Sequence, residues 1–202
     1  MMKKKLLIIL SVLVLVSSAL SASFLQLGPN YSIAFPIDTE SSTPVDVTAL
    51  DFQNFRLGAD LRFNIGYLTL EEGIKASFTD ELLLSSFDVS TLVGLRAKVW
   101  IFDFLVGAGL RCTAVKSEES KWLFNGAFEP DALECVKTSS LFYKGAVDIN
   151  MGKWVTLSLS AILPVNQTIN SLNEVQSVSV VDALTPSLKD TTVSVGLLFN
   201  FF

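Results

Sequence analysis

The chain contains no histidine, and only 17% of its 202 residues are charged. Without histidine, the most frequent general base and the commonest metal ligand of proteins are both missing. A Ser-His-Asp hydrolase is excluded for the same reason. The adjacent carboxylates Glu71 and Glu72 do not replace such a site, because neighbouring residues of a strand point to opposite faces. We therefore expect no enzymatic activity, no cofactor and no metal centre.

Basic residues are also scarce, with 15 Lys and Arg against 20 Asp and Glu. Three of the lysines occupy positions 3–5, in a segment that we expect to be removed. Without them the chain keeps 12 basic against 20 acidic residues, a net charge of −8. Nucleic acid is not an expected partner, because binding to a phosphate backbone requires a basic surface.

The first 23 residues have the three parts of a cleavable export signal. Three lysines are followed by an apolar core, residues 6–16, and then by small residues at positions 19–23. The core is shorter than the ~20 apolar residues of a transmembrane helix, which disfavours a retained signal anchor. Residues 1–23 are thus predicted to be a cleaved signal peptide, and residues 24–202 to form one domain.

Long apolar runs are missing from the rest of the chain, although 50% of all residues are hydrophobic. High hydrophobicity without long runs is explained by alternation, in which every second residue of a strand faces an apolar medium. Eight segments alternate in this way: Leu25–Ile37, Phe55–Ile65, Tyr67–Phe78, Phe87–Ile101, Phe104–Ala114, Leu141–Met151, Trp154–Val165 and Thr191–Phe202. Within the third, residues 71–73 interrupt the rhythm and suggest a bulge.

The connections between these segments alternate in length. Short turns are expected near Gly66, Asp103 and Gly152, and longer loops at residues 38–54, 79–86, 115–140 and 166–190. Short turns on one side and long loops on the other are typical of outer-membrane barrels. The sequence therefore predicts an all-β, eight-stranded antiparallel up-and-down transmembrane β-barrel. A soluble lipocalin-like barrel, the alternative, would place its apolar residues inside.

The last strand carries a spaced pattern of Ser194, Gly196, Phe199 and Phe201, followed by one further residue, Phe202. This pattern resembles the assembly signal of bacterial outer-membrane barrels, which usually stop at the last aromatic residue. Together with the export signal and the eight strands, it makes the mature chain similar to the small OmpA, OmpX and OmpW class. The resemblance implies a monomer in the cell outer membrane, surrounded by outer-membrane lipid, inserted by the barrel assembly machinery, with surface-exposed loops.

The resemblance implies more than one function. Members of the class serve membrane integrity, surface adhesion or the passage of small molecules, and the four external connections look most like the OmpW type, which is associated with hydrophobic solutes. Our first hypothesis is a structural or surface-interaction role, in which the loops contact a host or matrix surface ligand. The alternative is a narrow channel or transporter for small, hydrophobic molecules.

Charged residues occur on the inward phase of the predicted strands. An eight-stranded barrel is just wide enough for side chains to fill its interior, and buried charges have to be paired. The inward set is of mixed sign: Arg56, Asp60, Arg62, Glu71, Lys75, Asp88, Arg96, Lys98, Arg111, Lys144 and Asp148. An interlocked salt-bridge core and a narrow polar conduit both fit these residues.

The third long loop carries two further features. Cys112 and Cys135 both fall on the external, oxidising side, so we expect a disulfide that closes a loop of roughly 24 residues and stabilises the fold by about 3 kcal/mol. Between them lies an apolar cluster, Trp122, Leu123, Phe124 and Phe128. Exposed aromatic residues often mark contact sites, so the cluster is a candidate for binding a host, matrix or lipid surface. Alternatively it caps the barrel mouth or packs on Val178, Val180 and Val181.

Overall fold

The computed structural model describes residues 24–36, 55–79, 83–117, 119–128, 130–174, 184–188 and 190–201. The predicted signal peptide, the overhanging Phe202 and the three valines proposed as packing partners of the third loop lie outside these residues. Those predictions therefore stay predictions.

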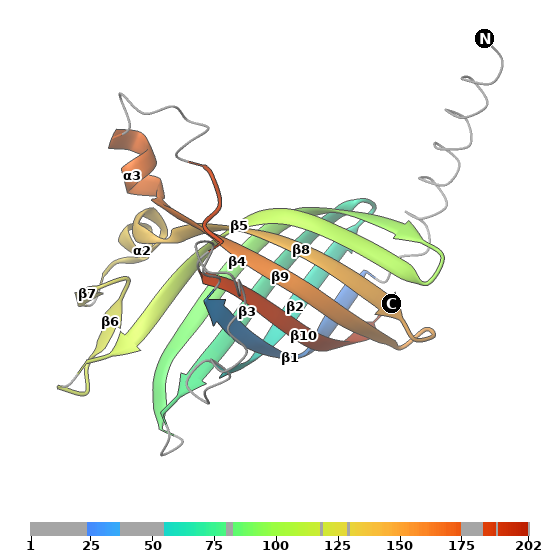
Figure 1. Ribbon diagram of the computed structural model, residues 1–202, viewed down its shortest axis with the longest axis horizontal. Helices are drawn as coiled ribbons and strands as arrows, with labels where there is room; N and C mark the ends of the chain where they lie inside the picture. Colours follow the sequence, from blue (N-terminus) through green and yellow to red (C-terminus); the bar gives the residue numbers. More distant parts are fainter. Residues whose placement is uncertain are drawn as a thin grey trace, which may run out of the picture.

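Eight long antiparallel strands form a closed barrel (Figure 1). They are β1 (Leu25–Pro36), β2 (Phe55–Ile65), β3 (Leu68–Phe78), β4 (Leu84–Val99), β5 (Phe102–Lys116), β8 (Ser140–Asn150), β9 (Val155–Thr168) and β10 (Asp190–Phe201). The order around the ring is β4-β3-β2-β1-β10-β9-β8-β5, and β4 pairs with β5 to close it. Each strand thus pairs with its neighbours along the chain, which confirms the predicted up-and-down barrel.

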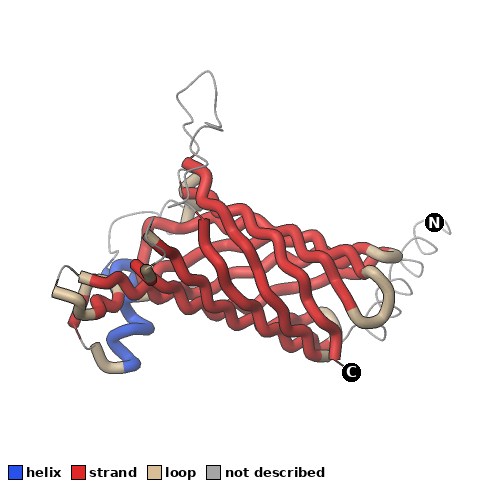
Figure 2. The backbone as a smooth tube through the Cα atoms, turned by 90° about the horizontal axis from the view of Figure 1, so that it is seen from below, coloured by secondary structure: helices blue, strands red, loops and turns tan. Residues whose placement is uncertain are grey.

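The smaller elements gather at one end of the barrel (Figure 2). β6 (Trp122–Phe124) and β7 (Ala127–Phe128) form a hairpin that pairs with the last residues of β5. Two short helices, α2 (Ala132–Thr138) and α3 (Ile169–Glu174), lie at this same end. The opposite end of the barrel is where Leu25 of β1 pairs with Phe201 of β10. Neither described helix has the length and apolarity needed to cross a membrane.

The predicted strand boundaries agree with the structure to within three residues, and β2 agrees at both ends. Two details were wrong. The turn expected near Asp103 lies at residues 100–101, and Asp103 is a buried β5 residue opposite Lys98. The bulge expected at residues 71–73 is absent, because pairing there is regular and the register shift of β3 falls between Ser77 and Phe78. Glu71 faces the charged interior in regular pairing, so no bulge is needed to place it there.

Side chains alternate strictly between the two faces of the sheet. In β10, for example, residues 193, 195, 197, 199 and 201 are exposed, and the residues between them are buried. The exposed face is a band of Leu, Val, Ile and Phe, as expected for strands whose outer face meets lipid. Trp100, 80% exposed, and Trp154 lie at the turns beside the chain termini, where aromatic rings favour a membrane–water interface.

Barrel closure requires a glycine where β1 meets β10. A Cβ atom built on Gly28 would lie 1.8 Å from the carbonyl oxygen of Leu197. The next residue, Pro29, has no N–H to donate to the ladder. The backbone of β10 therefore lies too close to this position of β1 to leave room for a side chain.

Val93→Arg should destabilise the barrel in a bilayer. Val93 is 59% exposed on the outward face near the middle of β4, and a basic side chain at the bilayer midplane costs ~2–4 kcal/mol. Val99→Arg, on the same face at the turn end of β4 and 53% exposed, is the matched control, since the cost near the interface is ~0–1 kcal/mol. Urea unfolding in lipid vesicles measures both; equal losses would contradict the assignment of this face to lipid.

Candidate functional site: the barrel interior and its outer mouth

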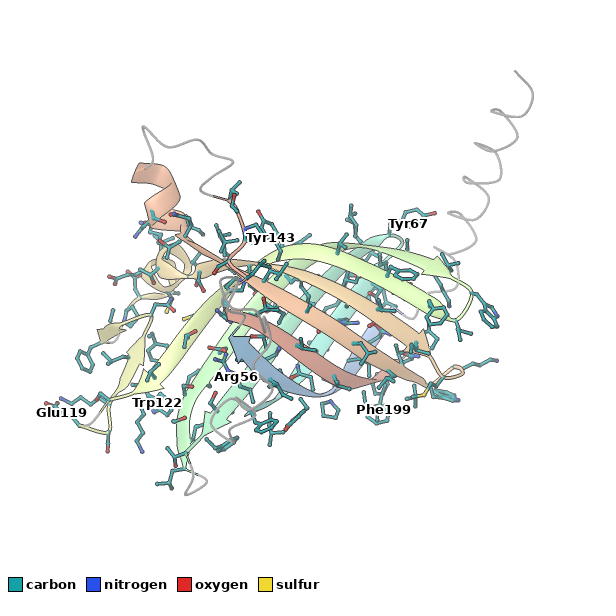
Figure 3. The ribbon with its side chains drawn as sticks, viewed as in Figure 1. Arg56, Tyr67, Glu119, Trp122, Tyr143 and Phe199 are labelled. Atoms are coloured by element: carbon teal, nitrogen blue, oxygen red, sulfur yellow. The ribbon has the colours of Figure 1, made fainter. Side chains whose placement is uncertain are left out.

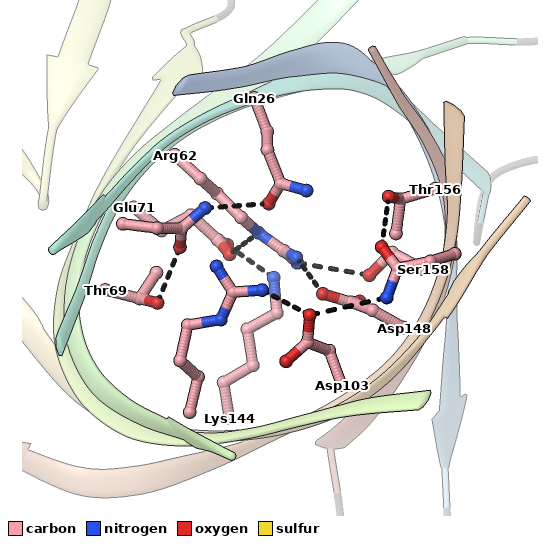
Figure 4. A network of polar contacts seen from close by, with 12 residues as sticks. Gln26, Arg62, Thr69, Glu71, Asp103, Lys144, Asp148, Thr156 and Ser158 are labelled. Carbon is pink, nitrogen blue, oxygen red and sulfur yellow. Dashed lines mark hydrogen bonds and ion pairs between the residues drawn. The ribbon is translucent and has the colours of Figure 1, made fainter. Parts of the chain in front are cut away.

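The centre of the barrel is crossed by the side chain of Arg62, which is 1% exposed. Its Nε donates to Glu71 Oε2 on β3 at 2.5 Å, and its Nη1 donates to Asp148 Oδ2 on β8 at 2.6 Å. Nη2 donates to Ser158 Oγ on β9 at 3.1 Å, and Lys144 forms an ion pair with the other oxygen of Glu71. Figure 4 shows this network. Because β2 and β8 lie opposite each other in the ring, Arg62 spans the lumen.

Two further sets of side chains extend the network toward the end of the barrel that carries the short turns, here called the turn end. Arg96 forms an ion pair with Asp103, which also accepts from Asn150 Nδ2 at 3.4 Å. Uncharged side chains form a second chain of hydrogen bonds below them: Gln26, Asn64, Thr69, Thr156 and Asn200. The ion pairs Arg62–Glu71, Arg62–Asp148, Lys144–Glu71 and Arg96–Asp103 thus hold three cations and three carboxylates. The network is electrically balanced, which a low-dielectric interior requires.

A cluster of apolar side chains lies beside this network on one wall of the lumen, formed by β4, β5, β8 and β9. Its members are buried on the inward face: Leu92, Leu105, Phe142, Ala146 and Ile162. Sequence reasoning missed this cluster, because it treated inward positions as polar. The available signal was a run of small inward residues on β4 and β5. A Cβ on Gly109 would lie 2.6 Å from Phe142, and one on Gly107 would lie 2.9 Å from Leu92.

The outer mouth contains a pocket of about 380 Å³, here called the mouth pocket. It is lined by residues from six strands: Ala34, Arg56, Arg111, Ser140, Pro164, Val165, Gln167, Thr168 and Thr192. The end of β9 is irregular here, because Ser140 pairs with Thr168 whereas Phe142 pairs with Pro164. A narrower hollow of about 20 Å³, roughly one water in size, continues inward toward Phe142 and Ile162.

Arg56 and Asp88 fix one wall of the mouth. Arg56 Nη1 donates to Asp88 Oδ2 at 2.5 Å, and Thr113 Oγ1 donates to the other carboxylate oxygen at 2.7 Å. The Arg56 side chain remains partly exposed; Figure 3 labels it among the strands. One layer deeper, Asp60 accepts from Asn30 Nδ2 at 2.6 Å.

The predicted interior residues therefore fall into two groups. Arg62, Arg96, Lys144 and Asp148 belong to the central network, whereas Arg56, Asp60, Asp88 and Arg111 lie toward the mouth. Lys98 is half-buried near the turn end, opposite Asp103 in the ladder. Of the ion-pair partners, sequence reasoning missed Asp103, because it placed a turn there. Among the described residues, no group of three or more Cys, Asp or Glu side chains could hold a metal ion.

The aromatic residues of the third loop do not cap the mouth. Trp122 packs on Phe87 with ring centroids 5.1 Å apart, and Phe124 meets the same ring edge-on at 6.0 Å. Leu123 pairs with Val115 and with Phe128 in the hairpin, and Phe128 is exposed. Since β6 continues the place of β8 beside β5, this cluster extends the wall of the barrel beyond its rim.

The two cysteines lie side by side. Cys112 Sγ and Cys135 Sγ lie 3.6 Å apart as two thiols, in contact but not bonded. The disulfide therefore stays a prediction, with its two residues already adjacent.

In the terminal pattern of the last strand, Phe199 and Phe201 are exposed on the outward face of β10, and Gly196 is buried opposite Asn30 of β1.

No protein-family model matches the chain, and no curated protein matches it in sequence. Among solved structures it is similar to the crystal structure of Neisserial surface protein A, with a TM-score of 0.50 and 11% identity over 89% of this chain and 98% of that one. The N-terminal β-barrel domain of Pseudomonas aeruginosa OprF matches with a TM-score of 0.48 and 8% identity, over 88% of this chain and 96% of that one. The fold is that of the small eight-stranded outer-membrane barrels.

The barrel should unfold more easily when its central cation, Arg62, is removed. Arg62→Met leaves Glu71 and Asp148 buried without their shared partner, and breaking a buried ion pair costs ~3–5 kcal/mol. Lys121→Met is the control, because its pair with Glu119 is exposed and worth ~0–1 kcal/mol. Denaturant unfolding in vesicles compares the variants, and a similar small loss in both would show that Arg62 is not part of a buried network.

The cysteine pair should become a disulfide when the protein is exported. Counting reactive thiols in denatured protein that was never reduced should give none, because the two sulfur atoms already touch. Reduction should then lower the free energy of unfolding by up to about 3 kcal/mol, the loop-entropy value. Two reactive thiols in the unreduced protein would contradict the bond, and Cys135→Ser checks that any loss on reduction arises from this pair.

Proposed function

We propose that this protein is an integral outer-membrane barrel without a through-channel, and that its role is structural or surface-interacting. The observation that carries the proposal is the Arg62 side chain, which joins opposite walls of the lumen through Glu71 and Asp148. A continuous water path through the barrel would have to break these bonds. It would also have to pass the apolar cluster that includes Leu92 and Ile162.

The external end offers the surface for interaction. Beyond the rim, the third loop exposes apolar side chains that the barrel does not use: Phe128, which is 57% exposed, with Leu133 and Val136 of α2. Apolar residues grouped outside the lipid-facing band favour contact with another surface. We propose that the loops face the cell exterior and that the partner is a host or matrix ligand.

Planar-bilayer conductance tests the closed lumen. Protein whose folding is verified by a heat-dependent gel shift should give no discrete channels. The triple variant Arg62→Ala/Lys144→Ala/Phe142→Ala, which empties the centre of the network and opens the apolar cluster beside it, should conduct if it still folds. Reproducible channels from the wild-type protein would instead favour the transport alternative, and the lumen would then have to open.

Whole-cell binding to immobilised matrix proteins tests the surface role. Phe128→Ser/Leu133→Ser should lower binding several-fold, because it removes two apolar contacts from the third loop. Met151→Ser, exposed at the opposite end of the barrel, should leave binding unchanged. Equal binding by all three proteins, at equal amounts on the cell surface, would remove the loop from the proposal.

A further inference from the structure

One carboxyl group of the barrel wall faces the lipid. Glu72 lies on the outward phase of β3, between Leu70 and Ile74, which are 40% and 52% exposed. Among the strand residues whose side chains the structure describes, one other charged residue has this phase, Lys116 at the outer tip of β5. Glu72 is therefore an exception near the middle of an otherwise uncharged band.

The carboxyl group is held at this depth by a neighbouring strand. Thr91 of β4 is the register partner of Glu72, and its Oγ1 donates to Glu72 Oε2 at 2.7 Å. Thr91 is exposed on the same face. The hydrogen bond runs from strand to strand, so the carboxyl group is not turned toward either membrane surface. We call these two residues the Glu72–Thr91 pair.

Lipid does not satisfy this pair. Within the described part of the chain, no Lys or Arg forms an ion pair with Glu72. An acyl chain offers no hydrogen-bonding group, and ionisable residues in membranes usually pair with other protein groups. The neighbours on the same face are aliphatic: Leu61, Leu70, Ile74, Val89 and Val93. Since lipid is as apolar as these side chains, the carboxyl group is what gains from contact with a protein.

We infer that the Glu72–Thr91 pair is the centre of a two-fold interface with a second copy of this chain in the membrane. Copies inserted in the same direction carry the pair at the same depth. A two-fold axis along the membrane normal therefore brings two pairs face to face, and each Glu72 meets the Thr91 or the Glu72 of its neighbour. A hydroxyl and a protonated carboxyl group each donate and accept, so the pair is complementary to itself.

The interface separates this chain from the small barrels that it resembles, for which a monomer is expected. It uses the outward faces of β3 and β4 and needs no cation from a different protein. It stands independently of the surface role proposed for the third loop.

Förster transfer between copies of the mature protein in phosphatidylcholine vesicles tests the interface. The label is attached at Met151→Cys, exposed at the turn end, after Cys112→Ser and Cys135→Ser. With residues 72 and 91 unchanged, transfer should fall as lipid is added, as mass action requires. Glu72→Leu should weaken association about tenfold or more, because each half of the interface loses a hydrogen-bonding group. Glu72→Gln, whose amide donates and accepts, should stay within about threefold.

Two further variants supply a second measurement and a control. Thr91→Val removes the hydroxyl from the pair, so it should weaken association by an intermediate factor, and it covers the case in which Glu72→Leu does not fold. Tyr31→Phe removes an outward hydroxyl from β1 and should associate as the unchanged protein does.

Protein that is folded, unchanged at the pair and monomeric at every lipid ratio overturns the inference and leaves the pair to a different membrane protein. Unweakened association in both Glu72→Leu and Thr91→Val, or an equal loss in Tyr31→Phe, overturns it as well.

Discussion

The contact between Arg62 and Asp148 joins two strands that face each other across the barrel, and the interior is organised around it. A barrel in lipid must turn its apolar side chains outward, so its polar side chains are forced into a narrow, low-dielectric lumen. Charges in that position are stable only when they are paired. Arg62 meets this requirement by contacting two carboxylates, and Lys144 supplies the second cation that Glu71 needs.

The interior is therefore layered along the barrel axis. Near the turns lie uncharged hydrogen-bonded side chains and the Arg96–Asp103 pair, followed by the balanced network around Arg62. Beside it, Leu92, Leu105 and Phe142 belong to an apolar cluster on one wall, made possible by glycines on the neighbouring strands. The outermost level holds the open mouth pocket.

The fold was predictable because alternation in a membrane barrel is enforced at every residue. The segment 55–65 reads the same in the sequence and in the structure, since each inward Arg or Asp is followed by an outward apolar residue.

That the charged residues face inward followed from the same rule, but the identity of their partners did not. Pairing Arg62 with Asp148 depends on the ring order and the stagger of eight strands, which no local pattern encodes. The turn was expected near Asp103 because the alternating segments were assigned to end at Ile101 and to restart at Phe104, whereas it lies at residues 100–101. The third loop likewise contains aromatic residues whose packing on Phe87 depends on a hairpin that extends β5.

Solid-state NMR in lipid bilayers would test the central claim directly, with nitrogen-labelled arginine and carbon-labelled carboxylates. The account predicts dipolar contacts from the Arg62 guanidinium nitrogens to the carboxyl carbons of both Glu71 and Asp148, present in wild-type protein and lost in Arg62→Lys. Contacts from Arg62 to water, and to neither carboxylate, would contradict it. The lumen would then be hydrated along its length, and the layered, closed interior would have to be abandoned.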